Sequence, residues 1–81
     1  MQIEVRLFAQ ARERVGAATL SLSLPDGSRV SDALSALERA YPELGELRPH
    51  LAAAVDGTLA RADSTLAEGC ELALLPPVSG G

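Results

Sequence analysis

The sequence contains no lysine, no asparagine and no tryptophan, and it has one cysteine, one tyrosine and one phenylalanine. A single cysteine cannot build a disulfide framework, and no His, Cys, Asp or Glu residues recur at metal-ligand spacing, so we expect neither a metal nor a cofactor. All seven basic residues are dispersed arginines and the formal net charge is −4, so we expect no nucleic-acid partner. No apolar run reaches bilayer length and no basic-then-apolar leader opens the chain, which predicts a cytoplasmic protein without membrane contact.

A recognisable active site is also missing. Cys70 falls at an inward position with no basic residue nearby, so it is expected to be a packed core thiol rather than a reactive one. His50 follows Pro49 in a predicted loop and has no evident partner, and the acidic residues are dispersed. Because there is no lysine, this chain cannot accept an acyl group on a lysine side chain, although it could be joined to lysines of other proteins.

Eighty-one residues suffice for one domain with one small core. Residues 2–8 alternate between apolar and polar side chains, which predicts a strand with one buried face. Residues 18–24 alternate in the same way, and the short connection between the two runs favours an antiparallel pair. Residues 9–15 lack the alternation and predict a short helical turn that Gly16 closes.

Apolar residues at helical spacing predict one main helix over residues 30–41. Ser28 or Ser31 is expected to cap its first turn, and Pro42 is expected to end it. Residues 43–50 are expected to form a loop or a short turn of helix.

The second half of the chain predicts three more strands. Residues 51–56 form a short apolar run that is too brief for a helix. Asp56-Gly57 is a strong hairpin signal and leads to a brief strand near residues 58–61. Residues 70–75 alternate again and predict the last strand.

This order of elements predicts an α+β fold in which one main helix packs on one face of a sheet. The helix-covered face is expected to carry Ile3, Val5, Leu7, Leu20, Leu22, Leu72 and Leu74. Phe8 and Leu75 point to the opposite, helix-free face, where they would meet if the first and last strands are neighbours. Exposed apolar patches on small domains often mark partner surfaces, although scattered exposed apolar residues are also ordinary.

The chain ends in Pro76-Pro77-Val78-Ser79-Gly80-Gly81. Two prolines favour an extended backbone, and side-chain bulk then falls to two glycines, so six extended residues would reach roughly 20 Å. We therefore divide the chain into a folded domain, residues 1–75, and an extended tail, residues 76–81. The tail is interpreted as presenting the Gly81 carboxyl group to partner enzymes, and an inert, frayed terminus is the alternative.

A bare carboxylate is a poor electrophile and needs activation, for example as an acyl-adenylate made from ATP. A sulfur donor that then displaces AMP would leave a thiocarboxylate, which is a nucleophile. Both steps would depend on partner enzymes, because the sequence contains no phosphate-binding loop.

Three motifs support a specific resemblance: Phe8-Ala9-Gln10-Ala11-Arg12-Glu13, Ala53-Ala54-Val55-Asp56-Gly57 and the terminal Pro76-Pro77-Val78-Ser79-Gly80-Gly81. With them, the whole chain resembles the MoaD/ThiS family of ubiquitin-like β-grasp sulfur carriers, which includes the small subunit of molybdopterin synthase. The family often has aromatic residues where this chain has Leu74-Leu75, and an acidic residue where Cys70 stands.

The resemblance implies a ubiquitin-like β-grasp with a mixed sheet, and it implies partners for each step. An ATP-dependent, ubiquitin-activating-like enzyme would adenylate Gly81, and a sulfur donor enzyme would convert it to a thiocarboxylate. The tail would then enter the large subunit of molybdopterin synthase, which is expected to carry the catalytic residues, and would give sulfur to cyclic pyranopterin monophosphate. By position, the residues implied to bind partners or to present the carboxyl group are Phe8, Leu59, Leu75, Pro76, Pro77, Val78, Ser79, Gly80 and Gly81.

Other functions share the same tail. A sibling sulfur carrier for thiamin, cysteine or tRNA thiolation has the same ending, although thiamin carriers typically lack the Phe8–Glu13 block and the paired prolines. A ubiquitin-like protein modifier would use the same carboxyl group on lysines of its targets. A plain interaction domain with an inert tail is the third possibility.

Overall fold

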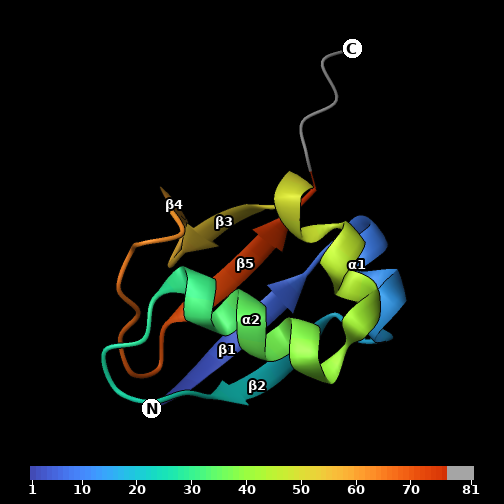
Figure 1. The fold of residues 1–81 in the computed structure, drawn as a ribbon. Helices are drawn as coiled ribbons and strands as arrows, with labels where there is room; N and C mark the ends of the chain where they lie inside the picture. Colours follow the sequence, from blue (N-terminus) through green and yellow to red (C-terminus); the bar gives the residue numbers. More distant parts are fainter. Residues whose placement is uncertain (77–81) are drawn as a thin grey trace.

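Five strands form one sheet in the order β2-β1-β5-β3-β4, and α2 packs across one face of it (Figure 1). The computed structural model describes residues 1–76. The strands are β1 (Gln2–Leu7), β2 (Thr19–Ser23), β3 (Ala52–Val55), β4 (Thr58–Ala60) and β5 (Glu71–Leu75). The helices are α1 (Ala9–Val15) and α2 (Val30–Ala40), with 3₁₀ turns η1 (Pro42–Glu46) and η2 (Arg48–His50).

The sheet is mixed, as expected. β1 pairs antiparallel with β2, which confirms the pairing predicted from the alternation of residues 2–8 and 18–24. On its other side β1 pairs parallel with β5, and β3 runs antiparallel to both β5 and β4. The first and last strands are therefore neighbours at the centre of the sheet, and each has a strand on both sides.

The start of α2 differs from the expectation. Its N-cap is Arg29, and the Asp32 carboxylate accepts the Arg29 backbone N–H at 2.8 Å. Ser28 is not the cap, because its hydroxyl donates to the Pro25 carbonyl at 2.7 Å within the preceding turn, and Ser31 is already inside the helix. An acidic side chain in the first turn suits the positive end of the helix dipole, and Asp32 closes this turn by accepting the backbone N–H of the N-cap residue.

The connecting segments are more regular than the sequence indicated. Residues 43–50, expected to be a loop or a short turn of helix, lie in η1 and η2 except for Leu47 between them, and each of these 3₁₀ turns has a proline near its start. The predicted hairpin at Asp56-Gly57 is present, and both residues have positive φ, 49° and 84°, as a type I′ turn requires. The preceding strand begins at Ala52, one residue later than expected.

The core lies between α2 and the sheet. Its side chains come mostly from the central strands and from α2, and they include Ile3, Val5, Leu7, Ala33, Leu37, Leu72 and Leu74. Cys70 is also buried, as predicted, and lies one residue before β5. Leu20 and Leu22 point toward the core but stay half-exposed, because β2 is an edge strand.

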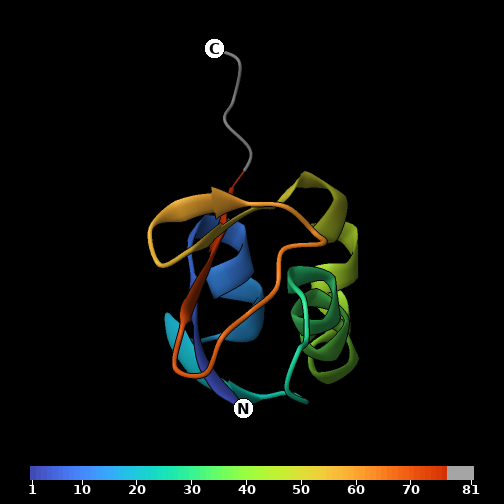
Figure 2. The same ribbon diagram turned by 90° about the vertical axis from the view of Figure 1, so that its left-hand side faces the viewer.

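β5 ends at the top of the domain in the view of Figure 1, and Pro76 follows it directly. Figure 2, turned by 90°, shows the sheet on one side and α2 on the other. Most of the predicted tail lies outside the described residues, namely Pro77, Val78, Ser79, Gly80 and Gly81. No helix within residues 1–76 is long and apolar enough to cross a membrane.

Leucines on the two faces of the sheet should respond differently to truncation. Leu74 is fully buried, so we expect Leu74→Ala to lower the free energy of unfolding by about 2–5 kcal/mol. Leu59 is 76% exposed, so Leu59→Ala should change it by no more than about 0.5 kcal/mol. Urea titration of both variants measures the difference, and equal losses would contradict the assignment of the two faces.

Candidate docking face and the root of the tail

The strand registers align a row of side chains across the helix-free face of the sheet. Arg6 on β1 is opposite Ala73 on β5. Ala73 is opposite Ala54 on β3, and Ala54 is opposite Leu59 on β4. Residues in register share a face, so Leu59 on β4 lies on the same side of the sheet as Arg6 on β1, with β5 and β3 between them.

A second row lies closer to the tail. Phe8 directly follows β1 and keeps an extended backbone, with φ −131° and ψ 155°, so it continues the alternation of that strand. Since Leu7 pairs with Leu74, the next step along both strands puts Phe8 beside Leu75. Leu75 in turn pairs with Ala52 of β3. The sheet therefore brings Phe8 and Leu75 together as the alternation predicted, and the register adds Leu59 to the same face.

We call this surface the outer face, and define it by Phe8, Ala54, Leu59, Ala73 and Leu75. Within residues 1–76, Phe8 and Leu59 are the large apolar side chains that remain exposed, at 37% and 76%. Leu75 is half-buried between them. A cluster of apolar side chains that the core does not use, next to the last described residue of the chain, is suited to binding another protein.

The outer face changes character along the strands. The guanidinium carbon of Arg6 lies 5.7 Å from the centre of the Phe8 ring, within range of a cation–π interaction. Arg6 Nη1 is also 3.8 Å from Glu71 Oε2. Glu71 is opposite Glu4, and its backbone N–H donates to Asp56 Oδ1 at 2.9 Å. Arg6 therefore stands between an apolar end near the tail and an acidic end away from it.

A hollow of about 310 Å³ lies at the root of the tail. Its lining residues are Phe8, Ala9, Gln10, Ala11, Leu47, His50, Leu51 and Pro76. His50, expected to be a surface residue without a partner, is exposed and lines this hollow. Sequence reasoning missed the hollow because it forms between α1 and the η1–η2 segment, which are far apart in the chain, and only Pro42 and Pro49 hinted at ordered turns there.

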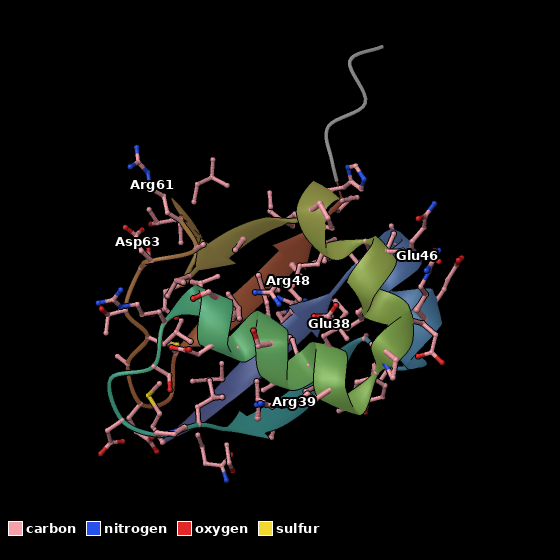
Figure 3. The ribbon with its side chains drawn as sticks, in the orientation of Figure 1. Glu38, Arg39, Glu46, Arg48, Arg61 and Asp63 are labelled. Atoms are coloured by element: carbon pink, nitrogen blue, oxygen red, sulfur yellow. The ribbon has the colours of Figure 1, made fainter. Side chains whose placement is uncertain are left out.

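Arg48 fixes the η1–η2 segment against α2. Its Nη1 donates to Ser35 Oγ at 3.1 Å and to Glu38 Oε2 at 3.2 Å, and its Nη2 donates to the Ser31 carbonyl at 3.4 Å. Figure 3 shows Arg48 and Glu38 facing one another between the two segments. On the other side, Arg14 of α1 donates to the Glu43 carbonyl at 2.9 Å. These contacts position the segment that carries Leu47 and His50, which line the hollow together with Pro76.

Nothing in the described part of the chain forms a group of three or more His, Cys, Asp or Glu residues that could hold a metal ion. The outer face is lined mainly by apolar side chains, and the hollow combines apolar groups with Gln10 and His50, so both offer surface for binding.

A mixed five-stranded sheet with one main helix across it defines the ubiquitin-like β-grasp class. A family model described as the ThiS family matches residues 5–81, and the chain belongs to this family of ubiquitin-like sulfur carriers. It is 36% identical to the molybdopterin synthase sulfur carrier subunit of Arabidopsis thaliana, over all of this chain and 84% of that protein.

Two further relatives differ in the role that their names give. Small archaeal modifier protein 1 of Haloferax volcanii is 39% identical, over 98% of this chain and all of that protein. Its crystal structure superposes with a TM-score of 0.88, over the full length of both chains at 35% identity. A complex of subunits 1 and 2 of molybdopterin-converting factor from Helicobacter pylori contains a chain that superposes with a TM-score of 0.70, at 27% identity over the full length of both.

The anchoring role of Arg48 predicts a local effect on stability. We expect Arg48→Met to lower the free energy of unfolding by about 1 kcal/mol, because three donated hydrogen bonds in a half-exposed site are lost. Amide hydrogen exchange at Leu47 and Leu51 should become faster. Arg39 forms no ion pair within residues 1–76, so Arg39→Met is the matched control and should leave both quantities unchanged. Equal behaviour of the two variants would remove the anchoring role.

Proposed function

We propose that this chain is the small, sulfur-carrying subunit of a molybdopterin synthase. The observation that carries the proposal is the outer face. Exposed Phe8 and Leu59 share one face of the sheet with the half-buried Leu75, and the sequence of the tail that follows ends in Gly80-Gly81. Membership of the sulfur-carrier family and the resemblance to named synthase subunits support the same role.

The proposed chemistry takes place at the Gly81 carboxyl group. In the first step a carboxylate oxygen attacks the α-phosphate of ATP, which forms an acyl-adenylate and releases pyrophosphate. Hydrosulfide delivered by a sulfur donor enzyme then attacks the acyl carbon and AMP leaves, so that the chain ends in a thiocarboxylate. That sulfur passes to cyclic pyranopterin monophosphate in two transfers, and water restores the Gly81 carboxylate after each one. The activating enzyme, the sulfur donor enzyme and the large subunit supply the catalytic groups.

The fold contributes a docking surface for the large subunit. Burial of an apolar side chain of this size is worth about 1.5–3 kcal/mol before the costs of association are subtracted. Phe8, Leu59 and Leu75 would thus bind the large subunit while Pro76, Pro77, Val78 and Ser79 lead the carboxyl group into it. The Helicobacter pylori complex of subunits 1 and 2 supports a partner of this kind.

Protein modification is the second candidate, and similarity to small archaeal modifier protein 1 favours it. A modifier would use the same adenylated Gly81, but a lysine amine of a target protein would attack the acyl carbon in place of sulfur. Sibling carriers for thiamin, cysteine or tRNA thiolation share the thiocarboxylate and differ only in the acceptor. All of these proposed functions require activation of Gly81, and they differ in the molecule that accepts the sulfur or the acyl group.

Intact-mass measurement tests the carrier directly. We expect incubation with the cognate activating enzyme, ATP and a sulfur source to replace one terminal oxygen of the full chain by sulfur. A chain that lacks Gly81 should keep its mass, because its carboxyl group is one residue short of the activating site. An unchanged mass of the full chain would overturn the proposal, and heavier lysine conjugates in its place would favour the modifier.

The docking surface predicts the effect of a charge at Phe8. Phe8→Asp should weaken binding to the large subunit at least tenfold, because a carboxylate would be buried against apolar groups. Ala67→Asp is the matched control, since this exposed residue precedes the far end of β5 and should not affect binding. Titration calorimetry measures both affinities, and circular dichroism checks that both variants are folded. Wild-type affinity of the Phe8 variant would exclude the outer face as the binding surface.

A further inference from the structure

The free edge of β2 has none of the usual protection against pairing. β2 (Thr19–Ser23) pairs with β1 on one side, and no other strand within residues 1–76 pairs with its opposite side. In Figure 1 it lies along the lower margin of the sheet. Natural edge strands are commonly blocked by charged side chains, by proline or by a bulge. The sequence Thr-Leu-Ser-Leu-Ser contains no charge and no proline, and its register with β1 runs without a bulge.

The hydrogen bonds to β1 show which backbone groups remain at the edge. The Leu7 N–H donates to the Ala18 carbonyl at 2.8 Å, and the Leu24 N–H donates to the Met1 carbonyl at 2.9 Å. Even-numbered residues of this segment therefore point their backbone groups toward β1. Thr19, Ser21 and Ser23 consequently point their N–H and C=O groups away from the sheet, toward solvent.

Every second residue of β2 thus offers one N–H donor and one C=O acceptor at the free edge, three of each in total. This arrangement is complementary to a second copy of itself. If a second copy pairs antiparallel with its twofold axis at Ser21, then Ser21 is opposite Ser21 and Thr19 is opposite Ser23 of the other copy. All three outward-facing residues then exchange hydrogen bonds. A shift by two residues would leave one of the three without a partner, so this register uses the edge most fully.

The side chains suit the same register. Leu20 would lie opposite Leu22 of the other copy on the helix side of the sheet, and both leucines are half-exposed in the single chain. On the outer side, hydroxyl groups meet hydroxyl groups, which are favourable cross-strand neighbours. No like charges are brought opposite one another within the paired strands.

We propose that β2 is a docking edge for a second copy of this chain, which would extend the sheet across a twofold axis at Ser21. The paired segment is only five residues long, so the interface falls in the small, weak class and the association is reversible. β4, which carries Leu59, is at the opposite margin of the sheet, so the outer face stays open in the pair. The inference does not depend on the proposed function.

The test uses the full chain and NMR at concentrations from ~0.05 to ~2 mM. Amide signals of Thr19, Ser21 and Ser23 should shift with concentration, while that of Thr58 on the opposite edge should not. In a mixture of labelled and unlabelled chains, an isotope-filtered experiment should detect a contact between Leu20 Hα and Leu22 Hα of different copies. These atoms are close in a non-hydrogen-bonded antiparallel pair and are two residues apart within one strand.

Ser21→Lys should abolish the concentration dependence, because two ammonium groups would face each other at the axis. The fold should tolerate this change, since Glu4 is the cross-strand neighbour of residue 21. Thr58→Lys is the matched control and should keep the dependence. Concentration-independent signals in the wild-type chain, or an effect at Thr58 in place of Ser21, would overturn the proposal.

Discussion

The parallel pairing of β1 with β5 is the interaction on which the rest of this structure depends. It joins the two ends of the domain at the centre of the sheet, and it aligns Leu7 with Leu74, both of them almost completely buried. The same register carries Phe8 to the side of Leu75, where the chain leaves the domain. Packing on one face and the apolar surface on the other therefore follow from a single alignment of two strands.

The sequence allowed the faces of the strands to be predicted, because alternation is a local property. It assigned Phe8 and Leu75 to the helix-free face, and it located the hairpin at Asp56-Gly57. Local patterns do not determine the order of the strands. From the sequence, Leu59 was assigned to the docking surface only by the family resemblance, and the register of β3 with β4 and β5 now places it on the outer face. The expectation that Ser28 or Ser31 caps α2 was wrong, because the Ser28 hydroxyl bonds within the preceding turn and the N-cap residue is Arg29, whose N–H the Asp32 carboxylate accepts.

The hollow beside Pro76 could not be predicted from local sequence patterns either. Its walls come from α1 and from the segment that Arg48 holds against α2, and such contacts join residues far apart in the chain. The division into a folded domain, residues 1–75, and a tail, residues 76–81, rests on a change in composition alone and stays a prediction, because residues 77–81 lie outside the described residues. The fold family follows from local patterns and from strand register together, while the proposed chemistry at Gly81 depends on proteins other than this chain.

The burial of Cys70 has a practical consequence. This residue carries the chain's one thiol, and it is only 4% exposed. An alkylating reagent applied to the native protein would therefore find little accessible sulfur in the polypeptide itself. If the end of the chain carries sulfur as proposed, rapid alkylation of the folded protein would report that sulfur, because Cys70 contributes little reactive thiol of its own.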